Sequence, residues 1–300
     1  MPETREARLE YYATPGPFTR LDRHGHRLRD LPRGVPELCR VVQGLVLHVH
    51  QAFRYGVKVP ADRGEEVQIR RADEMIDRIL ELDGADLAEA RPPERRVVGN
   101  CRHFSTLLCA LLRHQGVPAR ARCGFAGYFE PGRYVDHWVA ETWDPSHGRF
   151  VLCDAQLDRV QREGIGIAFE PLDVPRDEFL VAGDAWERCR RGAADPQRFG
   201  IFDMWGRWFI AGNVVRDLAS LAKRELLPWD VWGPMALDDA SLQGSDLTLV
   251  ERAAVIGAQL DPPLDAVRAL AEDEPRLRVP RVVVANYPAP HEVDLGAGVD

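Results

Sequence analysis

Cys101, His137 and Asp154 occur in that order in this sequence, and their side chains are the three parts of an activated cysteine nucleophile. A thiol is a weak nucleophile at neutral pH because most of it is protonated. A neighbouring imidazole raises the thiolate fraction, and a carboxylate on the other imidazole nitrogen fixes the tautomer. The three residue types therefore predict attack of sulfur on a carbonyl carbon.

The apolar pattern around each of the three residues predicts where it lies in a helix or a strand. Asn100 is a favourable N-cap residue, and Cys101 begins a run with apolar residues at helical spacing. We therefore expect the Cys101 sulfur near the unpaired N–H groups of a helix start. His137 lies in the middle of a predicted strand, and Asp154 lies near the end of the next one. The short turn between these strands favours antiparallel pairing.

The apolar pattern of the whole chain predicts an α+β fold. Helices are expected at residues 37–53, 65–82, 101–114, 177–191, 205–226, 247–260 and 264–272. Strands are expected at 119–129, 134–143 and 149–157, separated by turns that contain Pro and Gly.

The predicted elements divide the chain into four parts. These are an extended N-terminal arm at 1–34, a catalytic core at 35–175, a helical extension packed on the core at 176–273 and an extended tail at 274–300. No long flexible linker separates the parts, so we expect one compact molecule.

Four stretches of sequence resemble the transglutaminase-like superfamily. They are GNCRHFS at 99–105, LLRHQGVPAR at 111–120, HWVAE at 137–141 and LCD at 152–154. The resemblance implies a papain-like core, with an antiparallel sheet packed on helices, to which the helical C-terminal extension is added. It also implies that Cys101 is the nucleophile, His137 the general base and acid, and Asp154 the residue that orients the imidazole.

The sequence departs from the family pattern at two positions. The family often has Trp two residues after its His, whereas here Trp138 follows His137 directly and Val139 takes that place. Papain-like enzymes commonly place a Gln before the Cys as an oxyanion donor, and here that residue is Arg95. The backbone N–H of Cys101 can still serve as one donor, but the second donor is not identified.

Other residues compete for these roles. Asp136 and Asp158 are alternative carboxylates, although strand alternation turns Asp136 away from His137. A zinc site is disfavoured because its candidate ligands diverge around a helix or lie far apart. Those candidates are Cys101, His103, Cys109, His114 and Cys123, with the pair His48 and His50 as a further possibility. We expect no metal, no calcium site and no cofactor.

Asn100 and four tryptophans are candidate substrate-binding residues. Trp138 follows the predicted base, and Trp205, Trp229 and Trp232 lie in aromatic stretches that could cover the thiol with an apolar wall. The alternative for these stretches is ordinary packing of the helical extension.

Composition limits the partners of this 300-residue chain. A net charge of −8 and a pI near 5.7 argue against a nucleic-acid partner. No apolar run reaches the roughly 18 residues that cross a bilayer, and the charged N-terminus lacks the features of a signal peptide. We therefore expect a cytoplasmic protein whose six cysteines are reduced thiols; its oligomeric state is left open.

The function predicted from these observations is acyl transfer through a thioester on Cys101. The substrate is an amide or an ester, in a peptide, a protein or a small molecule. Water would resolve the thioester in a hydrolase, and an amine would resolve it in an amide-forming enzyme. The alternative is an inactive scaffold of the same fold that binds a peptide or protein partner.

Overall fold

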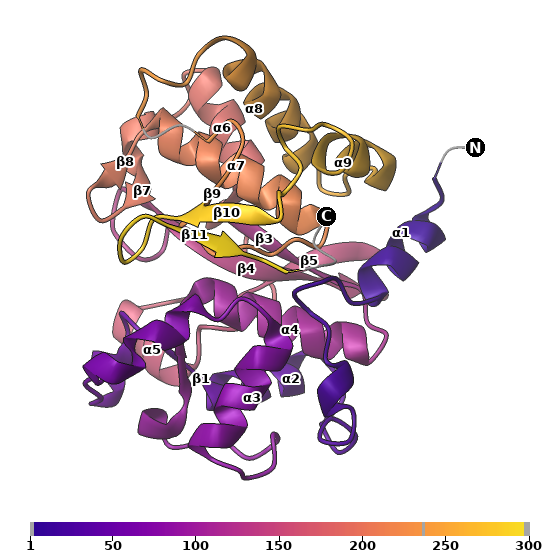
Figure 1. The fold of residues 1–300 in the computed structure, drawn as a ribbon, viewed down its shortest axis with the longest axis vertical. Coiled ribbons are helices and arrows are strands. Elements are labelled where there is room, and N and C mark those ends of the chain that lie inside the picture. Colours follow the sequence, from indigo (N-terminus) through magenta and orange to yellow (C-terminus); the bar gives the residue numbers. More distant parts are fainter. Residues whose placement is uncertain (1–2, 236–237, 297–300) are drawn as a thin grey trace. The chain divides into compact units, whose positions relative to one another are not determined.

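The computed structural model describes residues 3–235 and 238–296 (Figure 1). The chain forms two compact units, each built from segments distant in sequence. The Cys101 unit comprises Leu9–Ala121 and Val139–Val174. The His137 unit comprises Met1–Arg8, Arg122–Trp138 and Pro175–Asp300. The four parts expected from the sequence have different bounds from these two units, and that division stays a prediction.

Helix α4 (Cys101–His114) is the central helix of the Cys101 unit. Its residues from Cys101 to Arg113 are all buried, because α2, α3, β1 and β2 pack around it. The other helices and strands that lie wholly within this unit are α2 (Val35–Leu45), α3 (Ala72–Leu82), α5 (Arg159–Ile165), β1 (Val46–His48), β2 (Val97–Gly99) and β5 (Arg149–Cys153), with 3₁₀ helices at Asp22–His24, Ala52–Tyr55, Ala61–Gln68 and Pro93–Arg95.

Strands β1 and β2 form a short parallel ladder immediately before α4. Val46 pairs with Val97, and His48 pairs with Gly99. The ladder continues through the N–H of Val49, which donates to the carbonyl of Gly99 at 2.8 Å. The chain that enters α4 is therefore held by residues about 50 positions earlier.

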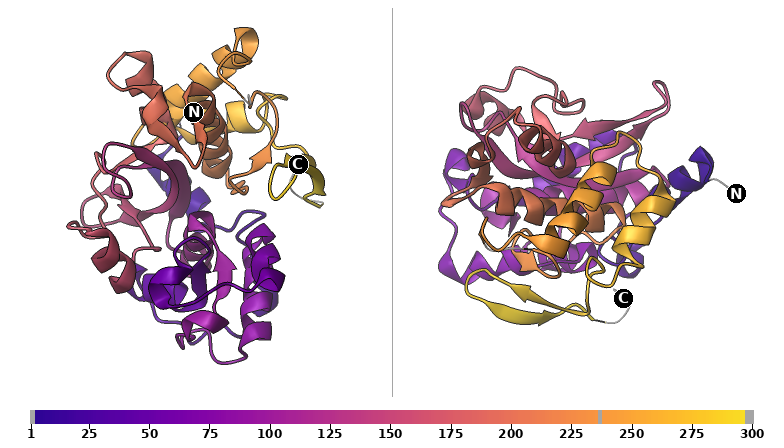
Figure 2. Two further views of the ribbon diagram at one scale, coloured as in Figure 1. Left: turned by 90° about the vertical axis from the view of Figure 1, so that its left-hand side faces the viewer. Right: turned by 90° about the horizontal axis from the view of Figure 1, so that it is seen from above.

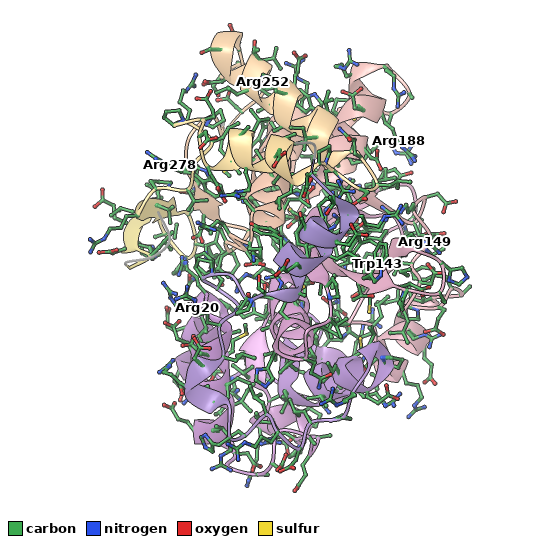
Figure 3. All side chains as sticks on the ribbon, turned by 90° about the vertical axis from the view of Figure 1, so that its right-hand side faces the viewer. Arg20, Trp143, Arg149, Arg188, Arg252 and Arg278 are labelled. Carbon is green, nitrogen blue, oxygen red and sulfur yellow. The ribbon has the colours of Figure 1, made fainter. Side chains whose placement is uncertain are left out.

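The predicted hairpin before Asp154 is confirmed. Strands β4 (Tyr134–Asp144) and β5 pair antiparallel, from Ala140 with Cys153 to Asp144 with Arg149. At the end of this ladder, the rings of Trp143 and Phe150 lie 5.3 Å apart. Figure 3 labels Trp143 and Arg149 at this hairpin.

Three of the secondary-structure predictions for the first 82 residues were wrong. The helix expected at 37–53 ends at Leu45, because the next three residues are buried in β1 and pair with β2. The helix expected at 65–82 is divided into a 3₁₀ helix that ends at Gln68 and α3, which begins at Ala72. The arm expected to be extended contains α1 (Arg5–Ala13).

The His137 unit contains four helices that each overlap one predicted from the sequence. They are α6 (Ala182–Arg190), α7 (Arg207–Leu221), α8 (Gly244–Gly257) and α9 (Leu264–Ala271). Helices α6, α7 and α8 pack against one another, and α7, α8 and α9 lie side by side in both views of Figure 2. Gly183 permits the approach of α6 to α8, since a Cβ there would lie 2.5 Å from the carbonyl oxygen of Ala254.

The strands differ from the prediction in two ways: the largest sheet is not wholly antiparallel, and the C-terminal part of the chain also contains strands. The largest sheet has the order β6-β3-β4-β7-β8, with β5 paired to β4, and β7 runs parallel to β4. A smaller sheet has the order β11-β10-β9, so much of the expected tail is paired. These strands are β3 (Ala119–Ala126), β6 (Phe179–Val181), β7 (Phe199–Ile201), β8 (Met204–Trp205), β9 (Asp230–Val231), β10 (Val282–Ala285) and β11 (His291–Asp294).

None of the helices in the described ranges combines the length and apolarity needed to span a bilayer.

Candidate active site

Cys101 is the first residue of α4, as the sequence predicts, and a capping box precedes it. The side-chain oxygen of Asn100 accepts the N–H of Arg102 at 3.0 Å. In return, Nδ1 of His103 accepts the N–H of Asn100 at 3.1 Å. The N–H of His103 donates to the carbonyl of Asn100 at 2.9 Å. Three N–H groups at this helix start are thus satisfied by the helix start itself.

The N–H of Cys101 is the exception at the helix start. Across residues 3–235 and 238–296, this N–H has no hydrogen-bond partner. The Cys101 residue is 7% exposed, so its sulfur lies in a largely dry setting at the positive end of a 14-residue helix. A backbone donor at that position can stabilise negative charge that develops on a nearby oxygen.

His103 acts as a hydrogen-bond acceptor because it is neutral. Burial, reinforced by the nearby Arg102 guanidinium, holds the pKa of His103 well below its usual range. A neutral imidazole keeps one acceptor nitrogen, which the Asn100 N–H uses. Gly99 makes room for the ring, since a Cβ there would lie 2.8 Å from both Cβ and Cγ of His103.

Glu66 holds the strand that leads into Cys101. Its buried carboxylate accepts the N–H of Val98 at 2.7 Å and pairs with Arg63 at 2.7 Å and Arg78 at 2.9 Å. Burial alone would raise the pKa of Glu66, but the hydrogen bonds from Arg63, Val98 and Arg78 outweigh burial and lower it. Glu66 has no local signal in the sequence, because its partners lie on three separate segments.

Asp154 is buried and follows β5, which ends at Cys153 rather than at the predicted residue 157. Its Oδ1 accepts the N–H of Gln156 at 3.0 Å, and its own N–H donates to the carbonyl of Pro171 at 2.8 Å. The competing carboxylate Asp158 has a separate structural role, because it caps α5 and accepts the N–H of Gln161 at 3.0 Å.

A chain of side-chain hydrogen bonds begins at Gln156. Its Nε2 donates to Oε1 of Gln161 at 2.9 Å, and Nε2 of Gln161 donates to the Tyr55 hydroxyl at 3.1 Å. Burial raises the pKa of Tyr55 well above its usual range, so the hydroxyl remains protonated. The segment after Asp154 is therefore anchored to the Cys101 unit by polar contacts as well as by packing.

His137 belongs to the His137 unit, where it is buried against three aromatic rings. The centroid of its imidazole lies 4.9 Å from Phe129, 6.0 Å from Tyr128 and 6.2 Å from Phe179, each with the ring planes steeply inclined. These contacts were not predicted from the sequence. The only local signal was the adjacent pair Tyr128-Phe129 at the turn before His137.

Asp136, the other competing carboxylate, contacts α7. Its Oδ1 accepts a hydrogen bond from Nδ2 of Asn213 at 2.6 Å. The side-chain oxygen of Asn213 in turn accepts a hydrogen bond from Nη1 of Arg216 at 3.1 Å. Burial raises the pKa of Asp136, although the Asn213 bond and the Arg216 charge work against this shift.

The candidate substrate-binding tryptophans have different settings in the His137 unit. Trp138 is fully buried, and Trp232 is buried with its Nε1 donating to the carbonyl of Leu277 at 3.1 Å. Trp205 is half-buried beneath the Arg133 guanidinium, and the half-buried Trp229 lies 5.0 Å from the ring of Tyr287. Trp205 and Trp229 thus keep accessible surface, and substrate binding by the four tryptophans and Asn100 stays a prediction.

The described cysteines form no disulfide and belong to no metal-ligand cluster. All six cysteines are free, and the sulfurs of Cys39 and Cys153 lie 3.4 Å apart. In the described part of the chain, no group of three or more His, Cys, Asp or Glu side chains could hold a metal ion.

A family model locates the resemblance within the chain. Residues 83–155 match the model of the transglutaminase-like superfamily. This segment is therefore similar to a transglutaminase-like domain. It contains all three predicted catalytic residues: Cys101 and Asp154 in one unit, and His137 in the other, on strand β4, which runs through both.

The other comparisons are limited. The chain is similar to the solved structure of a candidate cysteine protease from Cytophaga hutchinsonii, with 16% identity and a TM-score of 0.34. The similarity covers 57% of this chain and 44% of that one, so it spans less than half the length of the solved protein. No curated protein matches this chain.

Proposed function

We propose that this protein is a cysteine-dependent enzyme that transfers acyl groups through a thioester on Cys101. The observation that carries the proposal is the start of α4, inside the transglutaminase-like domain. There Cys101 is the first helical residue, and its N–H has no partner among the described residues, while the neighbouring N–H groups are capped.

The helix start favours the reactive form of the thiol. The aligned peptide dipoles of α4 place about half a positive charge at its N-terminus, which stabilises a thiolate relative to a thiol. The capping box uses the other N–H groups, so the Cys101 N–H remains to donate to an oxyanion.

In the proposed reaction, His137 and Asp154 complete the triad. The Cys101 thiolate attacks the carbonyl carbon of an amide or ester, and the negative charge moves to the carbonyl oxygen. His137, which has taken the proton of the Cys101 thiol, then donates it to the leaving amine or alcohol as the tetrahedral intermediate collapses to a thioester. Asp154 accepts a hydrogen bond from the second imidazole nitrogen and orients the ring.

The pairing of β4 with β5 supports this role for Asp154. Ala140 pairs with Cys153, and Asp154 follows Cys153 directly. The neighbouring carboxylates have other partners, since Asp136 bonds to Asn213 and Asp158 caps α5. Asp154 is therefore the carboxylate we assign to the triad.

Selective alkylation tests the nucleophile. We expect iodoacetamide to label Cys101 faster than any other cysteine, and to label it more slowly in His137→Ala. Cys189 is the informative comparison because it is the most exposed thiol, although burial raises its pKa to about 11. His114→Ala, which removes an exposed imidazole from the other end of α4, is the matched control. Equal labelling of all six thiols in the native protein would exclude the proposed triad.

Intact-protein mass measures the acyl transfer itself. We expect incubation with ester or amide donors to add the acyl mass to the wild type and not to Cys101→Ala. Discharge of this adduct in water alone indicates a hydrolase, and discharge that requires an added amine indicates an amide-forming enzyme. Fast labelling of Cys101 without any acyl adduct would favour the inactive scaffold instead.

A further inference from the structure

The opposite end of α4 carries a cavity that the proposed reaction does not use. It has a volume of about 310 Å³ and lies between the end of α4 and the loop before α2. Its lining residues are Leu28, Arg29, Leu31, Arg33, His114 and Gln115. Since α4 rises about 1.5 Å per residue, its 14 residues place this cavity about 20 Å from Cys101.

The two arginines of the cavity lack ionic partners. Among the described residues, neither the Arg29 nor the Arg33 guanidinium makes an ion pair or a hydrogen bond. Arg23, a few residues earlier, instead pairs with Asp73 at 2.8 Å and Asp77 at 2.9 Å. In a chain of net charge −8, two unpaired guanidinium groups beside one cavity are a local excess of positive charge.

Two leucines supply the apolar part of the cavity lining. Leu28 and Leu31 are buried, and the N–H of Leu31 donates to the carbonyl of Leu28 at 3.3 Å. The loop is attached to the helix end by Gln115, whose Nε2 donates to the carbonyl of Pro32 at 2.9 Å. Leu28 and Leu31 are thus the apolar residues that a short hydrocarbon bound in the cavity would meet.

We propose that this cavity binds a small organic anion. A guanidinium presents parallel N–H donors that match both oxygens of a carboxylate or phosphate. The head group would contact Arg29 and Arg33, and a short apolar chain would lie on Leu28 and Leu31. The volume is at the lower end of the range for ligand pockets, which restricts the ligand to a small molecule.

The dipole of α4 opposes the anion, and the arginines outweigh it. The C-terminal end of a helix carries about half a negative charge, whereas the two guanidinium groups carry two full positive charges. The last carbonyls of α4 are also occupied, because Leu112 accepts the N–H of Val117 at 2.9 Å and Arg113 accepts that of Gly116 at 3.0 Å. The balance of charge in the cavity therefore favours an anion.

An NMR titration of the full-length protein tests the site. The probes are hexanoate, hexyl phosphate and, as the uncharged analogue, hexan-1-ol. We expect the anions to produce saturable shifts at residues 28–33 and 114–115, and we expect the alcohol to produce none. The tighter of the two anions identifies the head group, and its affinity should fall as salt screens the exposed arginines.

Charge-removing variants assign the binding to the two arginines. We expect Arg29→Gln and Arg33→Gln each to raise the dissociation constant of the tighter anion about tenfold. Arg27→Gln is the matched control, because it removes the same charge from the same loop outside the cavity. An unchanged dissociation constant in either variant, equal shifts with hexan-1-ol, or no saturation by either anion would overturn the proposal.

Discussion

The start of α4 and the surroundings of His137 are organised by different kinds of contact. Around Cys101, directional bonds and close steric contacts hold the backbone: the capping box, Gly99 against His103, and Glu66 on Val98. Around His137, three aromatic rings contact the imidazole with their planes steeply inclined to it. We infer that substitutions near Cys101 have sharp effects, whereas substitutions around His137 have graded ones.

Hydrogen bonds and aromatic contacts respond differently to substitution of one partner. A hydrogen bond to a buried group is lost entirely when one partner is removed, and the remaining group stays unsatisfied. An aromatic contact depends on area and inclination, and another apolar side chain replaces part of it. The following substitutions test the contrast in order of expected effect.

Glu66→Ala is expected to have the largest effect, a loss of about 3 kcal/mol in the free energy of unfolding. It leaves the Val98 N–H and two arginines without their buried carboxylate. The lowered pKa of Glu66 means that its contribution is complete above the unfolded-state pKa and disappears as pH falls through the folded-state value. Urea unfolding should therefore show the variant and wild type converging in acid.

Glu163→Ala is the control for Glu66. Glu163 pairs with Arg159 across one turn of α5, with both side chains exposed, and we expect a loss below about 0.5 kcal/mol. Equal losses for the two glutamates would show that the Val98 contact adds nothing.

Gly99→Ala is expected to cost about 2 kcal/mol and to change the alkylation rate of Cys101. The new Cβ would lie 2.8 Å from the His103 side chain and 3.2 Å from Cγ1 of Val46. Thermal unfolding and iodoacetamide labelling measure the two effects. Gly64→Ala is the matched control, since no atom lies within 4 Å of its added Cβ. If Gly99→Ala were as stable as this control, the close contact between Gly99 and His103 would not contribute to the sharp effects expected near Cys101.

Asn100→Ala is expected to cost about 1 kcal/mol, through loss of the helix cap. Its side chain accepts the Arg102 N–H, which would then have to find another acceptor in a buried setting. Asn100→Ser retains an acceptor and should keep most of the stability in the same denaturant measurement. A serine variant as unstable as the alanine variant would show that capping is not the reason.

Phe129→Leu is expected to have the smallest effect, below about 1 kcal/mol, because leucine retains apolar contact with His137. The ring-proton shifts of His137 should nevertheless change, since its nearest aromatic neighbour, 4.9 Å away, is removed. Phe53→Leu, at a ring that is 67% exposed, is the control. A loss larger than that of Gly99→Ala would reverse the contrast between the two regions.

The parts of the fold that local signals control were predictable. The N-cap Asn100 and the bounds of α4 match the prediction, because the cap, the helical period and Gly116 are all read within one segment. The starts of β3, β4 and β5 also match, because Pro and Gly mark the turns between them. The setting of Cys101 follows from that local pattern, whereas the triad as a whole remains a proposal.

Contacts between distant segments were not predictable from periodicity. Residues 46–48 continue an apolar helical pattern, yet they form β1 because residues 97–99 offer them a parallel partner. The ring of Phe179 meets His137 across about 40 residues, and Glu66 reaches Val98 across about 30. Propensity is a local quantity, so it carries no information about partners at such separations.

The ladder between β1 and β2 determines how long a fragment must be to keep the start of α4 intact. The family model begins at residue 83, but the strand that secures Gly99 and the helices that cover α4 come from residues 35–82. A fragment cut at the limits of the match would lose β1, α2, α3 and Glu66 together, and the apolar flanks of α4 would face water. The unit that can be moved between proteins is therefore longer than the segment by which it is recognised.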